Sequence, residues 1–234
     1  EKKDTDMATA YAGKSHGRIR YIEHGGHVNK GLTASRNAGI ATANGQFVAF
    51  LDADDCWLPE KLARQCAIFK QFPQVQMICE ASVFWYSWKI WNEKDYVQLI
   101  GAGTGIHHPP HLMKQLYPLG DGQPPCPSGI IITKDALQRA GGFERTFSGI
   151  YQLYEDQAFL SKVYAREIVY ISGEANNMYR KRNDSMSAAA SNESLYKEVR
   201  MFYLKWLEEY FLKSSSAPPV IEKLINDFRR KLNT

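Results

Sequence analysis

Three aspartates follow an apolar segment in the first quarter of the chain. Residues 46–51 predict a strand buried in a sheet, and Asp52, Asp54 and Asp55 come directly after it. Residues i and i+2 of an extended chain point the same way, so Asp52 and Asp54 present two carboxylates on one side. Such hard oxygen donors at the carboxyl end of a strand suit a divalent cation that holds phosphate oxygens. A helix N-cap explains one aspartate but not three, so the pattern predicts a ligand site.

A second acidic pair, Glu155 and Asp156, stands where a helix over residues 154–165 is predicted to begin. The helix dipole stabilises a carboxylate at this position. The carboxylate acts as a general base if a substrate hydroxyl comes within about 3 Å. Acidic residues are common in the first turn of a helix, so the pair by itself favours structural capping.

Basic and glycine-rich stretches offer two further hypotheses. The three cations at 180–182 (Arg, Lys, Arg) could neutralise a diphosphate. They could equally form a basic turn in solvent, and the sequence of these three residues does not distinguish the two possibilities. The glycines at 101, 103 and 105 suggest a dinucleotide fingerprint, but Ile106 stands where that pattern needs a further glycine. The prolines that follow do not start a helix. The dinucleotide interpretation therefore fails.

Composition excludes several classes of protein. The 234 residues are 44% hydrophobic and carry a net charge of +4 with both signs interspersed, which predicts a globular protein that does not bind nucleic acid. The four cysteines are far apart, so no zinc site is expected. The histidines between residues 107 and 111 are predicted to lie exposed in a loop. No secretory leader or membrane-spanning run is evident, so we expect a cytoplasmic protein.

The elements that must position these groups alternate between helix and strand. The patterns predict helices at 4–12, 35–43, 59–69, 134–139 and 154–165, and strands at 18–23, 46–51, 128–133 and 168–172. Residues 77–88 predict one strand or a pair of strands. Residues 101–127 are rich in Gly, Pro and His and predict a long loop. This alternation indicates an α/β fold.

Two apolar stripes at helical spacing, in residues 194–212 and 220–232, are separated by a Ser- and Pro-rich linker. We expect two helices that pack on the rest of the domain. The basic residues at 229–231 keep a minority alternative open, in which these helices bind a partner or the inner face of a membrane.

Taken together and in order, these motifs resemble family 2 glycosyltransferases. The resemblance is carried by residues 29–40 (NKGLTASRNAGI), 45–55 (GQFVAFLDADD), 141–144 (GGFE), 155–156 (ED) and 179–187 (YRKRNDSMS). It implies a GT-A nucleotide-diphospho-sugar-binding sandwich with a mixed, mostly parallel central sheet. The catalytic domain would cover residues 1–187, and residues 188–234 would form a C-terminal helical extension.

The resemblance also implies an activity and its donor site. Members transfer a sugar, with inversion, from a nucleotide-diphosphate sugar to a hydroxyl of a saccharide, a lipid-linked sugar or another acceptor. For this chain we expect a UDP-sugar and a role in polysaccharide or glycoconjugate biosynthesis. By analogy, Asp54 would bind Mg²⁺ or Mn²⁺, Asp52 would face the donor's ribose or sugar, Arg36 would lie near the nucleotide, and Arg182 would lie near the diphosphate.

On the opposite side of the reacting carbon, Asp156 matches the family's catalytic base, and Glu155 would lie on the acceptor side. The loop at 101–127 is expected to help select the acceptor. Two other functions stay open at this stage: a non-catalytic nucleotide-sugar-binding or assembly module, and a nucleotidyltransferase of related fold. A homodimer is also left open.

The sequence departs from the family pattern at its start. The family begins with a strand carrying a Pro-x-Tyr-Asn-like pattern and a second strand ending in an Asp-Asp-Gly-Ser-like turn, and neither is present. Residues 4–6 resemble only the tail of that turn. We therefore expect the sheet to lack two strands and to leave apolar faces unpaired.

Overall fold

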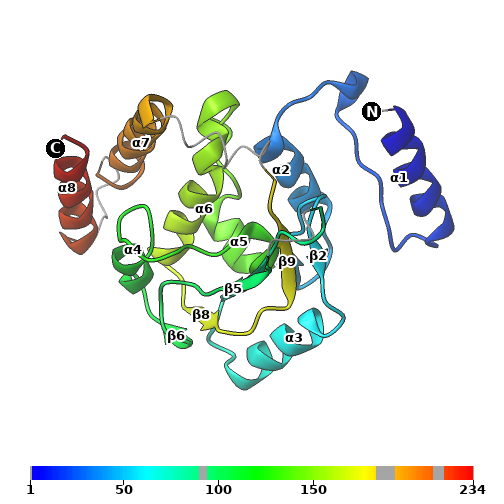
Figure 1. The fold of residues 1–234 in the computed structure, drawn as a ribbon, viewed down its shortest axis with the longest axis horizontal. Coiled ribbons are helices and arrows are strands. Elements are labelled where there is room, and N and C mark those ends of the chain that lie inside the picture. The colour runs from blue at the N-terminus through cyan, green and yellow to red at the C-terminus, as the bar shows by residue number, and fades with distance from the viewer. Residues whose placement is uncertain (1, 90–93, 183–192, 213–218, 234) are drawn as a thin grey trace.

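The computed structural model describes residues 2–89, 94–182, 193–212 and 219–233, with two β-sheets at its centre (Figure 1). The larger sheet has the spatial order β1 (Phe47–Ala49), β7 (Ile130–Thr133), β3 (Met77–Glu80), β8 (Val169–Ser172) and β6 (Gly105–His107). The smaller sheet has the order β2 (Cys56–Trp57), β9 (Asn177–Arg180), β4 (Ser82–Trp85) and β5 (Tyr96–Gln98).

The strand directions differ from the expectation. Among the described strands, five of the seven neighbouring pairs are antiparallel, and only β3–β8 and β4–β9 are parallel. The prediction of a mostly parallel sheet is therefore wrong, although the α/β class is confirmed. The alternation of strands and helices does not say in which direction a later strand enters the sheet. Here β7 lies between β1 and β3 and runs antiparallel to both.

The helices begin and end close to the predicted positions. They are α1 (Lys2–Lys14), α2 (Leu32–Thr42), α3 (Lys61–Gln71), α4 (His111–Gln115), α5 (Lys134–Ala140), α6 (Glu155–Tyr164), α7 (Glu193–Leu207) and α8 (Pro219–Asn233). Helix α5 shows why local sequence succeeds. The Thr133 side chain accepts the Ala136 N–H at 3.2 Å, and Gly141 ends the helix in the left-handed region with φ 71°.

Two predicted segments differ from the structure. Residues 18–23 form no strand, and this extended segment connects α2 to helix α1, which lies apart from the sheets (Figure 1). Residues 101–127 are not one loop, because they contain β6 and α4. Strand β6 forms because residues 105–107 pair with β8, a contact between positions more than sixty residues apart that local composition does not reveal.

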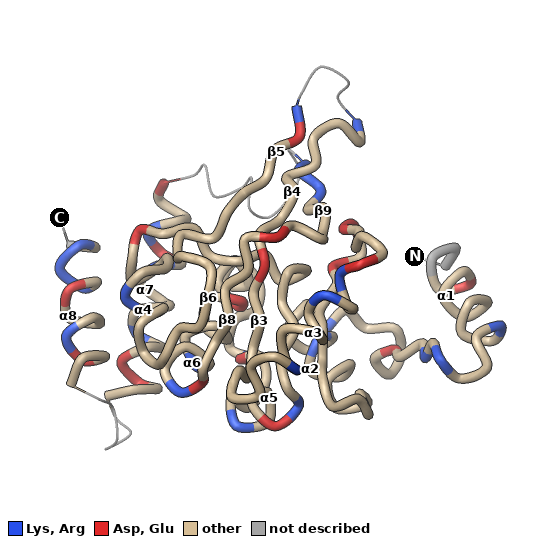
Figure 2. Tube along the Cα trace, turned by 90° about the horizontal axis from the view of Figure 1, so that it is seen from below, with Lys and Arg blue, Asp and Glu red and all other residues tan. Residues whose placement is uncertain are grey.

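Helices α7 and α8 pack on the rest of the molecule, as the sequence favoured. Val199 and Tyr203 of α7 and Ile225 of α8 are fully buried in the same hydrophobic core as the sheet residue Ile132. Acidic and basic residues alternate along the outer side of α8 (Figure 2). The basic residues at 229–231 pair with Glu208, Asp227 and Asp121. The boundary predicted near residue 187 lies outside the described residues and stays a prediction.

None of the helices in the described part of the chain is both long and apolar enough to span a membrane.

Candidate active site

Arg36, on α2, makes hydrogen bonds to one carboxylate that follows β1 and to another at the start of α6. Its Nη2 donates to Asp52 Oδ1 at 2.6 Å, and its Nη1 donates to Glu155 Oε1. The Arg36 side chain is only 8% exposed, and its guanidinium lies 5.1 Å from the centre of the Phe143 ring. A buried cation needs compensating charge. Arg36 and the two carboxylates therefore hold each other in place.

Ser128, which precedes β7, makes hydrogen bonds to both ends of the segment 52–55 that carries the three aspartates. Ser128 Oγ accepts the Asp52 N–H at 3.1 Å and donates to Asp55 Oδ2 at 2.6 Å. Asp55 Oδ1 also accepts the Arg180 N–H at 2.9 Å. Burial raises the pKa of Asp55 to about 6, although these two hydrogen bonds oppose the rise. Asp55 thus points inward as an anchor, and Asp52 and Asp54 are left for the site.

Asp54 is the more accessible of the remaining two carboxylates. Its Oδ2 lies 3.5 Å from Nη2 of Arg182, and both side chains are 38% exposed. Among the described residues, no group of three His, Cys, Asp or Glu side chains converges as a metal cage. Mg²⁺ is commonly held by one or two carboxylates together with substrate phosphates, so a single accessible carboxylate beside an arginine fits such an ion bound with a diphosphate.

Glu155 and Asp156 stand together in the first turn of α6. Asp156 is partly exposed, and its Oδ1 accepts the Gln157 N–H at 2.7 Å. Burial raises the pKa of Asp156 to about 6; the charge of Arg36 opposes this rise and that of Asp52 adds to it. Burial also raises the pKa of Glu155, and the positive charge of Arg36 opposes this rise as well. Glu155 Oε2 is buried without a hydrogen-bond partner among the described residues.

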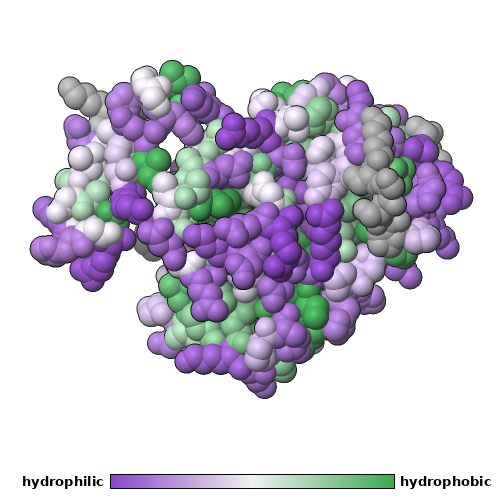
Figure 3. All heavy atoms as spheres, turned by 180° about the vertical axis from the view of Figure 1, so that it is seen from behind, coloured by the Kyte–Doolittle hydropathy of each residue, from purple (hydrophilic) through white to green (hydrophobic). Residues whose placement is uncertain are grey.

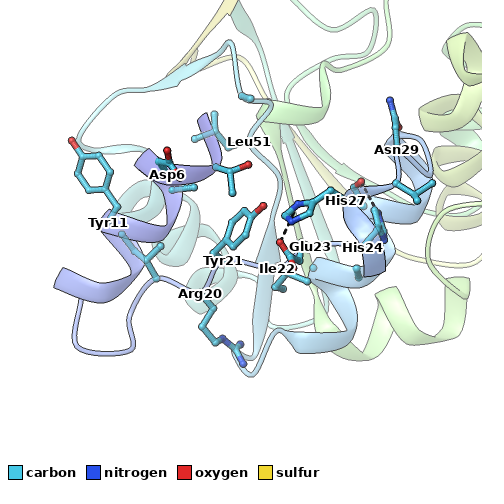
Figure 4. A pocket seen from close by; sticks show the side chains of 18 residues that line it. Asp6, Tyr11, Arg20, Tyr21, Ile22, Glu23, His24, His27, Asn29 and Leu51 are labelled. Carbon is cyan, nitrogen blue, oxygen red and sulfur yellow. Dashed lines mark hydrogen bonds and ion pairs between the residues drawn. The ribbon is translucent and has the colours of Figure 1, made fainter. Parts of the chain in front are cut away.

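A cleft of about 1530 Å³ opens between α1, the extended segment after it, α2 and the residues that follow β1. Figure 4 shows its lining, and Figure 3 shows the hollow that separates α1 from the rest of the molecule. The cleft reaches Ala53, between Asp52 and Asp54. Its lining includes two exposed apolar residues, Ile19 and Leu51, which are 49% and 48% exposed. The volume exceeds the roughly 300–1,000 Å³ of typical small-molecule sites.

The structure brings together the six residues predicted for the site. Arg36 links Asp52 and Glu155, Asp156 is the next residue along α6, and Asp54 lies beside Arg182.

Sequence reasoning missed Ser128 and Gln157, because neither residue type nor spacing distinguishes them. For Ser128, only its hydrogen bonds to Asp55 and Asp52, which are 73 and 76 residues away in one turn, show its role. The roles assigned to all these residues stay predictions. The part of the last motif at residues 183–187 lies outside the described residues.

Comparison with protein families gives one extended match. The model of the family described as "Glycosyltransferase like family 2" matches residues 9–211. Among curated relatives, glycosyltransferase GlyA of Streptococcus pneumoniae is 27% identical over 177 residues, which are 73% of this chain and 23% of GlyA. WfgD of Escherichia coli, named a UDP-Glc:alpha-D-GlcNAc-diphosphoundecaprenol beta-1,3-glucosyltransferase, is 44% identical over 39 residues, which are 17% of this chain and 15% of WfgD.

The fold resembles that of a solved structure, S. aureus TarS 1-349 in complex with UDP-GlcNAc. The TM-score is 0.62 at 18% identity, and the match covers 94% of this chain and 58% of TarS 1-349. A second crystal structure of S. aureus TarS 1-349 gives a TM-score of 0.60 at 17% identity, and the match covers 96% of this chain and 58% of TarS 1-349. This chain thus spans less than two thirds of each of these relatives.

Proposed function

Because this chain belongs to the glycosyltransferase-like family 2, we propose that it transfers a sugar from a UDP-sugar to a hydroxyl of an acceptor, with inversion at the anomeric carbon. The observation that carries the proposal is the convergence on Arg36 of carboxylates from two distant segments, Asp52 after β1 and Glu155 at the start of α6. Asp54 and Asp156 flank this cluster on the two segments. A donor diphosphate and an acceptor hydroxyl therefore each have a carboxylate beside them.

The choice of UDP rests on relatives. The name of WfgD specifies a UDP-glucose donor, and the TarS structure holds UDP-GlcNAc. In this chain Asp54 would share a Mg²⁺ or Mn²⁺ ion with the donor diphosphate, and Arg182 would contact the same phosphates. A bound divalent ion supplies Lewis-acid stabilisation of the leaving diphosphate.

The acceptor side rests on Asp156. A carboxylate whose pKa is near 6 is ionised at neutral pH, yet it is a better base than an ordinary, fully solvated aspartate. It would take the proton of the acceptor hydroxyl as that oxygen attacks the anomeric carbon. A single displacement requires attack from the face opposite the departing UDP, and this is why the configuration inverts. Glu155 would keep Arg36 in position through Oε1 and face the acceptor side with Oε2.

The test is a UDP-release assay with a panel of UDP-sugars, Mn²⁺ and saccharide or lipid-linked acceptors. Asp156→Asn should reduce turnover by about 100-fold or more and leave UDP binding unchanged. Asp135→Asn is the matched control, because Asp135 is an exposed acid in the first turn of α5. Unchanged turnover in Asp156→Asn would remove the base role.

Two further measurements would assign another function. Release of pyrophosphate from a nucleoside triphosphate and a sugar phosphate would indicate a nucleotidyltransferase. Binding of a UDP-sugar without turnover for any acceptor would indicate a non-catalytic binding module.

A further inference from the structure

A second cavity, of about 350 Å³, lies between the loop after α4, the start of α6 and α7. Its lining combines aromatic and polar side chains, namely Tyr117, Asp121, Gln123, Tyr154, Gln157 and Tyr196. The volume is at the lower end of the range for small-molecule sites. The cavity is therefore large enough for a sugar ring but not for a folded segment.

Three tyrosines from three elements form one wall of this tyrosine pocket. The Tyr117 hydroxyl makes hydrogen bonds to the hydroxyls of both Tyr154 and Tyr196. The ring centres of Tyr117 and Tyr154 are 5.9 Å apart, and those of Tyr154 and Tyr196 are 6.0 Å apart. Because the hydroxyls satisfy one another, the rings contribute apolar surface to the pocket.

The loop that carries Tyr117 is held tightly in place. Tyr117 N–H donates to Gly122 O at 2.8 Å, and Gly101 N–H donates to Gln123 O at 2.9 Å. A Cβ on Gly101 would lie 2.3 Å from Gly122 Cα, so only glycine allows this approach. The wall is thus preformed, as is usual for ligand sites.

Gln157 supplies hydrogen-bonding groups that the protein itself does not use. The residue is 7% exposed and lines the pocket, and its side-chain amide makes no hydrogen bond within the described part of the chain. The amide atoms of Gln157 are not among the fully buried polar atoms, so the amide is open to a ligand or water in the pocket. An amide both donates and accepts, which suits vicinal hydroxyl groups.

The pocket adjoins the candidate base. Gln157 lines it, and the backbone N–H of the same residue donates to Asp156. The pocket therefore lies next to the candidate base, one residue further along α6.

We propose that the tyrosine pocket binds a sugar residue of the acceptor and so places the acceptor hydroxyl at Asp156. The inference deepens the proposed function and rests on it. Apolar ring surface together with an unpartnered amide matches the two faces of a pyranose, its C–H face and its hydroxyl groups. The acceptor is then a saccharide or a sugar-bearing lipid, and α7 takes part in recognition through Tyr196.

The experiment measures binding of methyl glycosides of glucose, galactose, mannose and N-acetylglucosamine by saturation-transfer NMR, with no donor present. At least one glycoside should bind the wild-type protein. Gln157→Met, which keeps the side-chain length, should weaken that binding about three- to tenfold, the effect expected for a lost hydrogen bond. Tyr196→Ala should weaken it further by removing part of the wall that the three tyrosines form. Far-UV circular dichroism and thermal unfolding verify that both variants fold.

Tyr151→Phe is the matched control, because the Tyr151 hydroxyl bonds Glu198 of α7 outside the pocket. It should bind glycosides as the wild type does. Absence of binding by all four glycosides, or equal binding by wild type and both pocket variants, would overturn the inference. UDP release measured in parallel separates the two proposals. A protein that binds glycosides through Gln157 but turns over no UDP-sugar would refute the proposed function alone. Normal transfer with an unchanged acceptor KM in Gln157→Met would refute the pocket alone.

Discussion

Replacing Arg36 by Met should destabilise the protein in a way that depends strongly on pH. Arg36 is 8% exposed, and its partner Glu155 has a side chain that is only 4% exposed. Without the guanidinium, Glu155 either stays charged in a buried position or takes up a proton. Asp52, at 26% exposed, is able to recover part of its hydration. The cost therefore falls mainly on Glu155.

The magnitude follows from that burial. Removal of one partner from a buried ion pair typically costs about 3–5 kcal/mol. Burial already raises the pKa of Glu155 and Arg36 opposes the rise, so the substitution raises this pKa further. A carboxyl group protonated in the folded state and ionised in the unfolded state loses about 1.4 kcal/mol of stability per pH unit as the pH rises above the unfolded pKa of about 4.3. Because the pKa of Glu155 in the wild type is already raised to about 8, the additional pH-dependent loss of the variant relative to wild type begins above about pH 8, at up to about 1.4 kcal/mol per pH unit.

The assay is urea unfolding followed by tryptophan fluorescence at several pH values. The double variant Arg36→Met/Glu155→Gln serves as control, because a neutral glutamine has no charge to compensate. It should recover most of the lost stability and lose the extra pH dependence. If Arg36→Met stays within about 1 kcal/mol of wild type throughout, or if the double variant keeps the steep pH dependence, the assignment of the cost to buried Glu155 is wrong.

Three further outcomes are expected. The value of kcat/KM should rise with pH through about 6 and then reach a plateau, because Asp156 must lose its proton to act as a base. A profile that stays flat down to about pH 5 would contradict this role. Ser128→Ala should lower the free energy of unfolding in urea by about 1–3 kcal/mol, because it removes a hydrogen bond from the buried Asp55 carboxylate. Ser128→Thr should retain most of that stability. Equal free energies of unfolding for the two variants would exclude the anchoring role. Asp54→Asn should raise the Mn²⁺ concentration needed for half-maximal UDP release by about tenfold or more, and an unchanged metal titration would mean that Asp54 is not the ligand.

Local sequence was sufficient for the elements whose limits depend on neighbouring residues. Thr133 and Gly141 mark the two ends of α5, and the apolar run before Asp52 marks β1. The apolar stripe in residues 220–232 indicated intramolecular packing, and its members Phe228 and Leu232 are buried, whereas Val220 is 42% exposed. Segment 18–23 has the alternation of a strand but forms none, because a strand also needs a partner and none of the described strands pairs with it.

The sequence by itself determined which carboxylates follow β1 and open α6, because these patterns involve residues a few positions apart. It did not determine how the charges are paired. Arg36 bonds carboxylates 16 and 119 residues away, and only the tertiary fold brings α2 close to the residues after β1 and to the start of α6. Tertiary packing also sets the antiparallel pairing of β7 with β1. It likewise brings together the hydroxyls of Tyr117 and Tyr196, which are 79 residues apart in the sequence. Such contacts depend on how separate elements bury their apolar faces together, so the tertiary structure alone decided them.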